Sequence, residues 1–237
     1  MRVVGISLKI KGVGKSFKKN VVLKDVNLEA RGSEILGLVG KSGCGKSTLL
    51  KILVGYYEPE KGKILLNNKD ISKDVLGLRR AVGYTTQENS FYEKLTVAEN
   101  MNYYANLYRV PLKTKEGRIK NLLAQVGLLR HKKLLAEKIS GGMKRRLDFA
   151  ISLVHDPSIL ILDEPTTGLD PILVEEFWKI VVEIVKKGRT AIVISHLFDE
   201  LEENCSRIGI MDKGKIIKIL SKVKKGQLMK EFTGTLK

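Results

Sequence analysis

The spacing of apolar residues along the chain predicts alternating strands and helices. Residues 35–39 form a short apolar run typical of a strand, and the pattern of residues 48–53 continues as a helix. Residues 159–162 and 191–194 are apolar at every position, as in strands buried on both faces of a parallel sheet. We therefore expect an α/β core.

Between residues 87 and 155 the apolar spacing is helical. Thr96 and Glu99 have the spacing of a capping box, and apolar residues recur along one face of the helix that follows. Further helical patterns begin at Ile119 and Met143, and Pro157 prevents the second from continuing. We expect one domain of residues 1–237, in which a helical subdomain of residues 87–155 interrupts a core made of residues 1–86 and 156–237.

The remaining patterns complete the core. Asp170 followed by Pro171 predicts the start of a helix, because these residue types favour its N-cap and first position. Residues 208–211 and 216–220 predict a closing hairpin, and a small terminal helix is expected after Lys222.

Composition indicates the cellular compartment of the protein. The apolar runs are far shorter than the ~20 residues needed to cross a bilayer, and the N-terminus has no apolar segment of the signal-peptide type. The two cysteines, Cys44 and Cys205, form neither a metal-binding spacing nor a disulfide framework. We expect a cytoplasmic protein.

The chain carries 43 Lys and Arg against 26 Asp and Glu, a formal net charge of +17. This charge is compatible with binding to nucleic acid or to an anionic membrane surface. It is equally compatible with a lysine-rich surface that only contacts solvent. The basic residues are scattered and are not interleaved with aromatic residues in one stretch, so we expect no specific nucleic-acid partner.

A phosphate-binding loop is the clearest motif. Its glycines lie five residues apart, a Lys-Ser pair ends it, and a predicted strand and helix flank it, as the motif requires. The loop consists of Gly40, Lys41, Ser42, Gly43, Cys44, Gly45, Lys46 and Ser47, and Thr48 follows it. Residues 12–16 have a similar tail, but Lys9 stands where the first glycine belongs, so we interpret them as a turn between early strands.

The loop and one acidic pair predict ATP and Mg²⁺ as ligands. Lys46 is placed to reach the β- and γ-phosphates, and Ser47 and Asp163 are placed to coordinate Mg²⁺. Glu164 directly follows Asp163 at the end of a predicted strand, which indicates a general base or a residue that polarises water.

Of the three histidines, we expect only His196 to bind the nucleotide. His196 follows the predicted strand of residues 191–194, where a hydrogen bond to the γ-phosphate is favoured over a structural role. We interpret His131 and His155 as surface residues. Ser140, Gly141 and Gly142 form a second glycine-rich segment that could bind an anion at a helix start.

Taken in order, these motifs resemble those of ATP-binding cassette (ABC) ATPases over nearly the whole chain. They are the phosphate loop, Gln87 within residues 83–88, the segment 140–142, residues 159–164, Gly168-Leu169-Asp170 and His196. The resemblance implies a P-loop NTPase (RecA-like) core with an antiparallel β subdomain and an inserted helical subdomain.

The resemblance also implies roles for residues outside the loop. Phe17 would stack on adenine, Gln87 would take part in the metal site and link it to the helical subdomain, and Asp170 would lie at a subunit interface. Ser140, Gly141 and Gly142 would bind the γ-phosphate held by another subunit. Two chains, identical or different, would then enclose two ATP molecules head to tail.

Met143 departs from the glutamine that the family usually has after Ser-Gly-Gly. Residues 140–148 are similar to the variant of ABC-2 type export cassettes. The resemblance thus implies the ATPase subunit of an exporter, peripheral on the inner face of the cell membrane and driving a separate multi-span permease. An importer ATPase, a soluble cassette ATPase of cluster assembly and a regulator without turnover are the alternatives.

Overall fold

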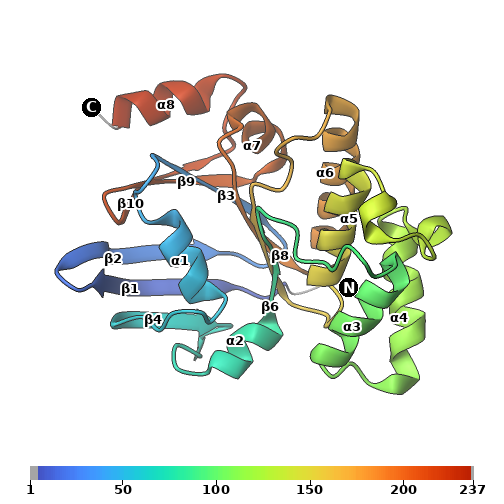
Figure 1. Cartoon of the computed structure of the whole chain (residues 1–237). Helices are drawn as coiled ribbons and strands as arrows, with labels where there is room; N and C mark the ends of the chain where they lie inside the picture. The colour runs from blue at the N-terminus through green and yellow to red at the C-terminus, as the bar shows by residue number, and fades with distance from the viewer. Residues whose placement is uncertain (1–4, 236–237) are drawn as a thin grey trace.

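The computed structural model describes residues 5–235 and contains two β-sheets, with helices between them and on the far side of the larger one (Figure 1). The larger sheet has six strands in the order β10-β9-β3-β8-β7-β6. Its strands from β9 to β6 run parallel, and β10 is antiparallel to β9 at one edge. The strands are β3 (Ile35–Gly40), β6 (Val82–Thr85), β7 (Ile159–Asp163), β8 (Thr190–Ile194), β9 (Arg207–Asp212) and β10 (Lys215–Ser221).

The smaller sheet is antiparallel and has the strand order β2-β1-β4-β5. It consists of β1 (Leu8–Phe17), β2 (Asn20–Ala30), β4 (Lys61–Leu66) and β5 (Lys69–Asp70). Helix α1 (Lys46–Leu53) lies between this sheet and the larger one, and α2 (Val75–Ala81) leads into β6. The two sheets confirm the α/β fold class with an antiparallel β portion.

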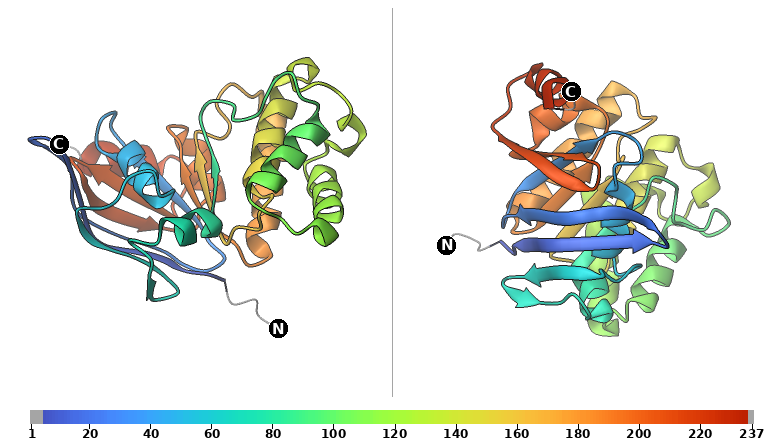
Figure 2. Two further views of the ribbon diagram at one scale, coloured as in Figure 1. Left: turned by 60° about the horizontal axis from the view of Figure 1, so that its bottom comes forward. Right: turned by 90° about the vertical axis from the view of Figure 1, so that its left-hand side faces the viewer.

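Three helices gather on one side of the larger sheet, away from the smaller one (Figure 2, left). They are α3 (Val97–Leu107), α4 (Leu112–Gln125) and α5 (Gly141–Ser152), with short 3₁₀ turns at Leu129–His131 and Ala136–Lys138. The capping box predicted for α3 is present, since the Thr96 hydroxyl accepts from the Glu99 amide at 3.2 Å and Glu99 Oε2 from the Thr96 amide at 2.7 Å. The helices α6 (Pro171–Lys186), α7 (Phe198–Asn204) and α8 (Gln227–Thr235) complete the described chain.

Alternation along the buried strands divides the core between the two faces of the larger sheet. Leu36, Ile161 and Ile192 pack toward α1 and the smaller sheet, whereas their neighbours Leu160 and Val193 pack toward α5 and α6. Successive strand residues point to opposite faces, so a wholly apolar strand supplies both cores. This is why the apolar runs predicted the central strands.

The interpretation of residues 12–16 as a turn is wrong. They lie inside β1, where the pairing with β2 shifts register on both sides of Val13. Gly12 has φ of +63°, a conformation that glycine adopts at little cost. The glycines therefore belong to an irregular strand that bends without reversing direction.

Candidate functional site

The predicted site residues come together because three neighbouring strands are parallel. The phosphate loop follows β3, Asp163 ends β7, and His196 comes two residues after β8. Strand β8 pairs with both β3 and β7. The carboxyl ends of parallel strands meet at one edge of a sheet, where α/β proteins bind ligands.

Backbone geometry requires glycine within the phosphate loop. Gly45 has φ of +111°, and a Cβ there would lie 2.8 Å from a methyl group of Leu23. Gly43 has φ of +77°, with no heavy atom within 4 Å of a Cβ position. A Cβ at Gly40 would lie 2.4 Å from the carbonyl oxygen of Met211. The loop thus passes close to its neighbours on one side and is open at Gly43.

Helix α1 begins at Lys46, directly after the loop. The Lys46 Nζ donates to the carbonyl oxygens of Gly40 at 2.6 Å and Lys41 at 3.1 Å. The first turn of α1, which includes Ser47 and Thr48, has no acidic residue. A helix N-terminus and an ammonium group therefore lie at the same loop, which fits a polyphosphate.

Asp163 lies near this loop at the end of β7. The Tyr84 hydroxyl donates to Asp163 Oδ2 at 3.3 Å. Burial raises the pKa of Asp163, and the charge of Glu164 adds to that rise. Burial also raises the pKa of Tyr84 to about 12, helped by the charge of Asp163. Because its negative charge is poorly solvated, this carboxylate is suited to a cation.

Glu164 and His196 form a direct contact that the sequence did not predict. His196 Nδ1 lies 2.8 Å from Glu164 Oε2, and the Glu164 side chain is 15% exposed against 66% for His196. Glu164 has φ of +49°, unusual for a residue with a side chain, and its amide donates to the carbonyl of Ile194 at 2.9 Å. The turn therefore aims this carboxylate toward the end of β8.

Ser140, Gly141 and Gly142 form the N-terminus of α5, with Ser140 as N-cap. The Ser140 hydroxyl accepts from the Met143 amide at 3.3 Å. Gly141 has no heavy atom within 4 Å of a Cβ position, whereas a Cβ on Gly142 would lie 2.5 Å from Leu173. Gly141 thus borders open space, whereas Gly142 lies against the side chain of Leu173.

Asp170 and Gln87 are both exposed. Asp170 caps α6 by accepting from the Leu173 amide at 3.0 Å, as its position before Pro171 predicted. Gln87 follows β6, the strand next to β7. Its carbonyl oxygen accepts from Arg145 at 3.4 Å, so the backbone of Gln87 is tied to α5.

Phe17 belongs to an aromatic group that sequence reasoning missed. It is 38% exposed, and its ring meets Tyr57 edge to face at a centroid distance of 5.1 Å. The Lys15 ammonium lies 5.7 Å from the Phe17 ring centroid. Tyr57 follows α1 by four residues, so only the fold brings it to the end of β1.

The interpretation of His155 as a surface residue is wrong. Its ring stacks on Tyr108 at 3.9 Å between centroids, and Nε2 lies 3.1 Å from the Val82 carbonyl oxygen. Burial lowers the pKa of His155. His131 is half-buried, so neither histidine is a solvated surface group.

Among residues 5–235, no helix is long and apolar enough to span a membrane. In the same range no three His, Cys, Asp or Glu side chains are placed to hold a metal ion together. Mg²⁺ at a phosphate site needs only one or two protein ligands besides phosphate oxygens and water, and the Ser47 hydroxyl and Asp163 carboxylate are donors of that kind.

Comparison with known proteins agrees with this geometry. Residues 23–167 match the family model described as ABC transporter. The linearmycin resistance ATP-binding protein LnrL of Bacillus subtilis is 33% identical over 215 residues, which cover 91% of this chain and 69% of LnrL. The lantibiotic transport ATP-binding protein SrtF of Streptococcus pyogenes is 37% identical over 210 residues, covering 89% of each protein.

A solved structure agrees as well. The protein cbiO1 from Clostridium perfringens, part of the ABC transporter complex cbiONQ, superposes with a TM-score of 0.84 at 30% identity, covering 95% of this chain and 92% of that one. The chain therefore belongs to the ABC transporter family, as one of its ATP-binding subunits that hydrolyse ATP.

Proposed function

We propose that this chain is the ATPase subunit of an exporter of the ABC-2 type. The observation that carries the catalytic part is the Glu164–His196 contact of 2.8 Å at the sheet edge that also holds Asp163 and the phosphate loop. The exporter part rests on the relatives named for linearmycin resistance and lantibiotic transport and on Met143 after Ser-Gly-Gly.

ATP binding is assigned to the loop and the aromatic group. Lys46 binds the β- and γ-phosphates, and Phe17 stacks on adenine with Tyr57 supporting its ring. The small residues of the loop allow backbone amides to surround the phosphate oxygens. The other phosphate-binding residues are Gly40, Lys41, Ser42, Gly43, Cys44, Gly45, Ser47 and Thr48.

Ser47, Asp163 and Gln87 are assigned to a Mg²⁺ site. When bound, Mg²⁺ would neutralise charge on the β- and γ-phosphate oxygens. The burial that raises the pKa of Asp163 makes a nearby cation favourable, because it would compensate a poorly solvated charge. Tyr84 keeps this carboxylate in place with its hydroxyl hydrogen bond.

Glu164 is assigned as general base and His196 as a γ-phosphate contact. A carboxylate that is mostly buried, and that has no Arg or Lys ion-pair partner among residues 5–235, can accept a proton from the attacking water. His196 shares its Nδ1 with Glu164, which orients the ring and leaves Nε2 for a phosphate oxygen. The contact thus links the general base, Glu164, to His196, the side chain that binds the γ-phosphate.

The remaining assignments require a second cassette subunit. Ser140, Gly141 and Gly142 bind the γ-phosphate held by the neighbouring subunit, through backbone amides at the N-terminus of α5. Asp170 lies at the interface between the subunits. The open space beside Gly141 is where a phosphate of the other subunit would fit.

The helices between residues 87 and 155 are assigned as the lobe that passes closure of the dimer to the membrane partner. The permease is a separate multi-span protein, and the chain works on the cytoplasmic face of the membrane. Copurification with an exporter permease is expected. A complex with an importer permease and a substrate-binding protein would contradict the exporter assignment.

The catalytic assignment is tested with Glu164→Gln. We expect ATP to bind with unchanged affinity, phosphate release to fall at least 100-fold, and an ATP-dependent dimer to accumulate on size-exclusion chromatography. Glu231→Gln, which removes a surface carboxylate paired with Lys218, is the control and should turn over normally. Full turnover in Glu164→Gln would refute the assignment.

A further inference from the structure

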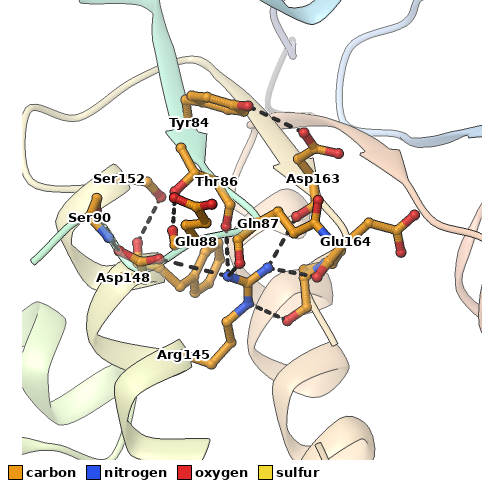
Figure 3. Close-up of polar contacts among 12 residues, drawn as sticks. Tyr84, Thr86, Gln87, Glu88, Ser90, Arg145, Asp148, Ser152, Asp163 and Glu164 are labelled. Carbon is orange, nitrogen blue, oxygen red and sulfur yellow. Dashed lines mark hydrogen bonds and ion pairs between the residues drawn. The ribbon is translucent and has the colours of Figure 1, made fainter. Parts of the chain in front are cut away.

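One buried arginine connects the helix of the glycine segment to both loops that carry candidate catalytic groups. Arg145 belongs to α5 and is 6% exposed. Its guanidinium donates to five backbone carbonyl oxygens, and Figure 3 shows it between the two loops. The pattern of α5 gave no sign of this, because Arg145 falls outside the predicted apolar face.

The first of these loops follows β7. Arg145 Nη2 donates to the carbonyl oxygens of Asp163 at 3.1 Å and Glu164 at 2.6 Å, and Nε donates to that of Pro165 at 2.7 Å. Glu164 is the residue with positive φ, a conformation that persists only where its surroundings hold it. Arg145 therefore binds the backbone carbonyl oxygen of Glu164 and those of the residues before and after it.

The second loop follows β6. Arg145 Nη1 donates to the carbonyl oxygens of Thr86 at 2.6 Å and Gln87 at 3.4 Å. Since β6 and β7 are neighbouring parallel strands, a single planar guanidinium can reach the end of both. Movement of either loop relative to α5 would break these hydrogen bonds.

Asp148 completes the arrangement from the next turn of α5. It is fully buried, and its Oδ2 lies 3.7 Å from Arg145 Nη1 and has no hydrogen-bond partner among the described residues. Its Oδ1 accepts from the Ser90 amide at 2.9 Å and from the Ser90 hydroxyl. A buried carboxylate with this geometry supplies the counter-charge that a buried guanidinium needs.

We propose that Arg145, with Asp148 as its counter-ion, is a positioning residue that sets the backbone of Glu164 and Gln87 for ATP hydrolysis from the same helix that presents Ser140 to Gly142. This inference rests on the proposed roles of Glu164 and Gln87. Within residues 5–235 the hydrogen bonds and ion pair of Arg145 reach neither the phosphate loop nor Phe17, so we expect it to act on turnover and not on nucleotide binding.

The test is Arg145→Lys in the full chain. Lysine keeps the charge but, as a single ammonium, cannot bind five carbonyl oxygens in one plane. We expect kcat for ATP to fall at least 10-fold while the ATP Kd stays within threefold of wild type. Arg189→Lys is the matched control, because Arg189 also binds a backbone carbonyl, Pro157, and a carboxylate, Asp156, but precedes the amino end of β8.

Asp148→Asn provides a second variant should Arg145→Lys fail to fold. The amide oxygen can still accept from Ser90, while the counter-charge of Arg145 is lost, so kcat should again fall with the ATP Kd retained. A folded variant of either residue with kcat within twofold of wild type, or with kcat and ATP affinity falling together, would overturn the inference. Either result would leave the Glu164→Gln test of the proposed function unaffected.

Discussion

Alanine substitution at two neighbouring glycines should separate folding from ATP-dependent dimerisation. Gly141 and Gly142 occupy the first two positions of α5, and only Gly142 lies against Leu173 of α6. The same methyl group is thus added to open space in one variant and to a packed contact in the other.

The structure gives opposite expectations for stability. At Gly141 no heavy atom lies within 4 Å of the new Cβ, and alanine is favoured over glycine in helices by ~0.5–1 kcal/mol, so the free energy of unfolding should stay equal or rise. At Gly142 the new Cβ would lie 2.5 Å from Leu173 Cδ1, about 1 Å inside ordinary contact. The half-buried Leu173 side chain must shift to relieve this contact, at a cost of about 1 kcal/mol.

Two measurements check these expectations. Urea unfolding without nucleotide gives the free energy of unfolding of each variant. Dimerisation with ATP is then measured by size-exclusion chromatography in the Glu164→Gln background, which we expect not to consume the ATP by hydrolysis. We expect Gly141→Ala to be stable and yet to dimerise at least 10-fold more weakly, because its methyl group occupies the space assigned to the neighbouring γ-phosphate.

Each half of the reasoning can fail by itself. Equal stability of the two variants would refute the packing argument at Gly142. Normal ATP-dependent dimerisation of Gly141→Ala would refute the assignment of the α5 N-terminus to a phosphate held by another subunit.

Two further predictions concern the nucleotide side of the site. Asp163→Asn should gain stability relative to wild type in the absence of nucleotide as the pH rises. The folded-state pKa of Asp163 lies above its ordinary value of 3.8, so the wild type loses stability between that value and the raised pKa. Urea unfolding across pH 4–8 tests this, and a pH-independent difference would contradict it. Phe17→Ala should raise the ATP Kd by ~5-fold or more, since stacking on a base contributes ~1–3 kcal/mol. Because Phe17 is 38% exposed, thermal unfolding should change little. An ATP Kd within twofold of wild type, measured by calorimetry, would count against adenine stacking.

Local patterns predicted the elements that depend on neighbouring residues. The capping box at Thr96 and Glu99 and the Asp170-Pro171 helix start are formed by groups within three residues of one another, and the structure contains both. The wholly apolar runs predicted β7 and β8 because burial on both faces leaves no polar position. Parallel pairing then made it predictable that Asp163 and His196 would meet at one edge.

Contacts between residues far apart in the sequence were not predictable in this way. Arg145 looked like one more basic residue of a positively charged chain, but the fold places β6 and β7 where its guanidinium meets five carbonyl oxygens. The sequence suggested that His155 is solvated, but in the structure the Tyr108 ring stacks on it. The residues next to each partner give no sign of such a contact. Each partner fits the apolar and polar pattern of its own helix or strand whether or not the distant residue is there.

The sequence by itself determined the order of elements, the phosphate loop and the strand ends that carry Asp163, Glu164 and His196, since glycine conformations and buried strands are encoded within a few residues. The tertiary structure alone decided which groups touch. It turned the Glu164 carboxylate toward His196 and joined the two loops through Arg145, because burial and hydrogen-bond geometry are properties of the assembled chain.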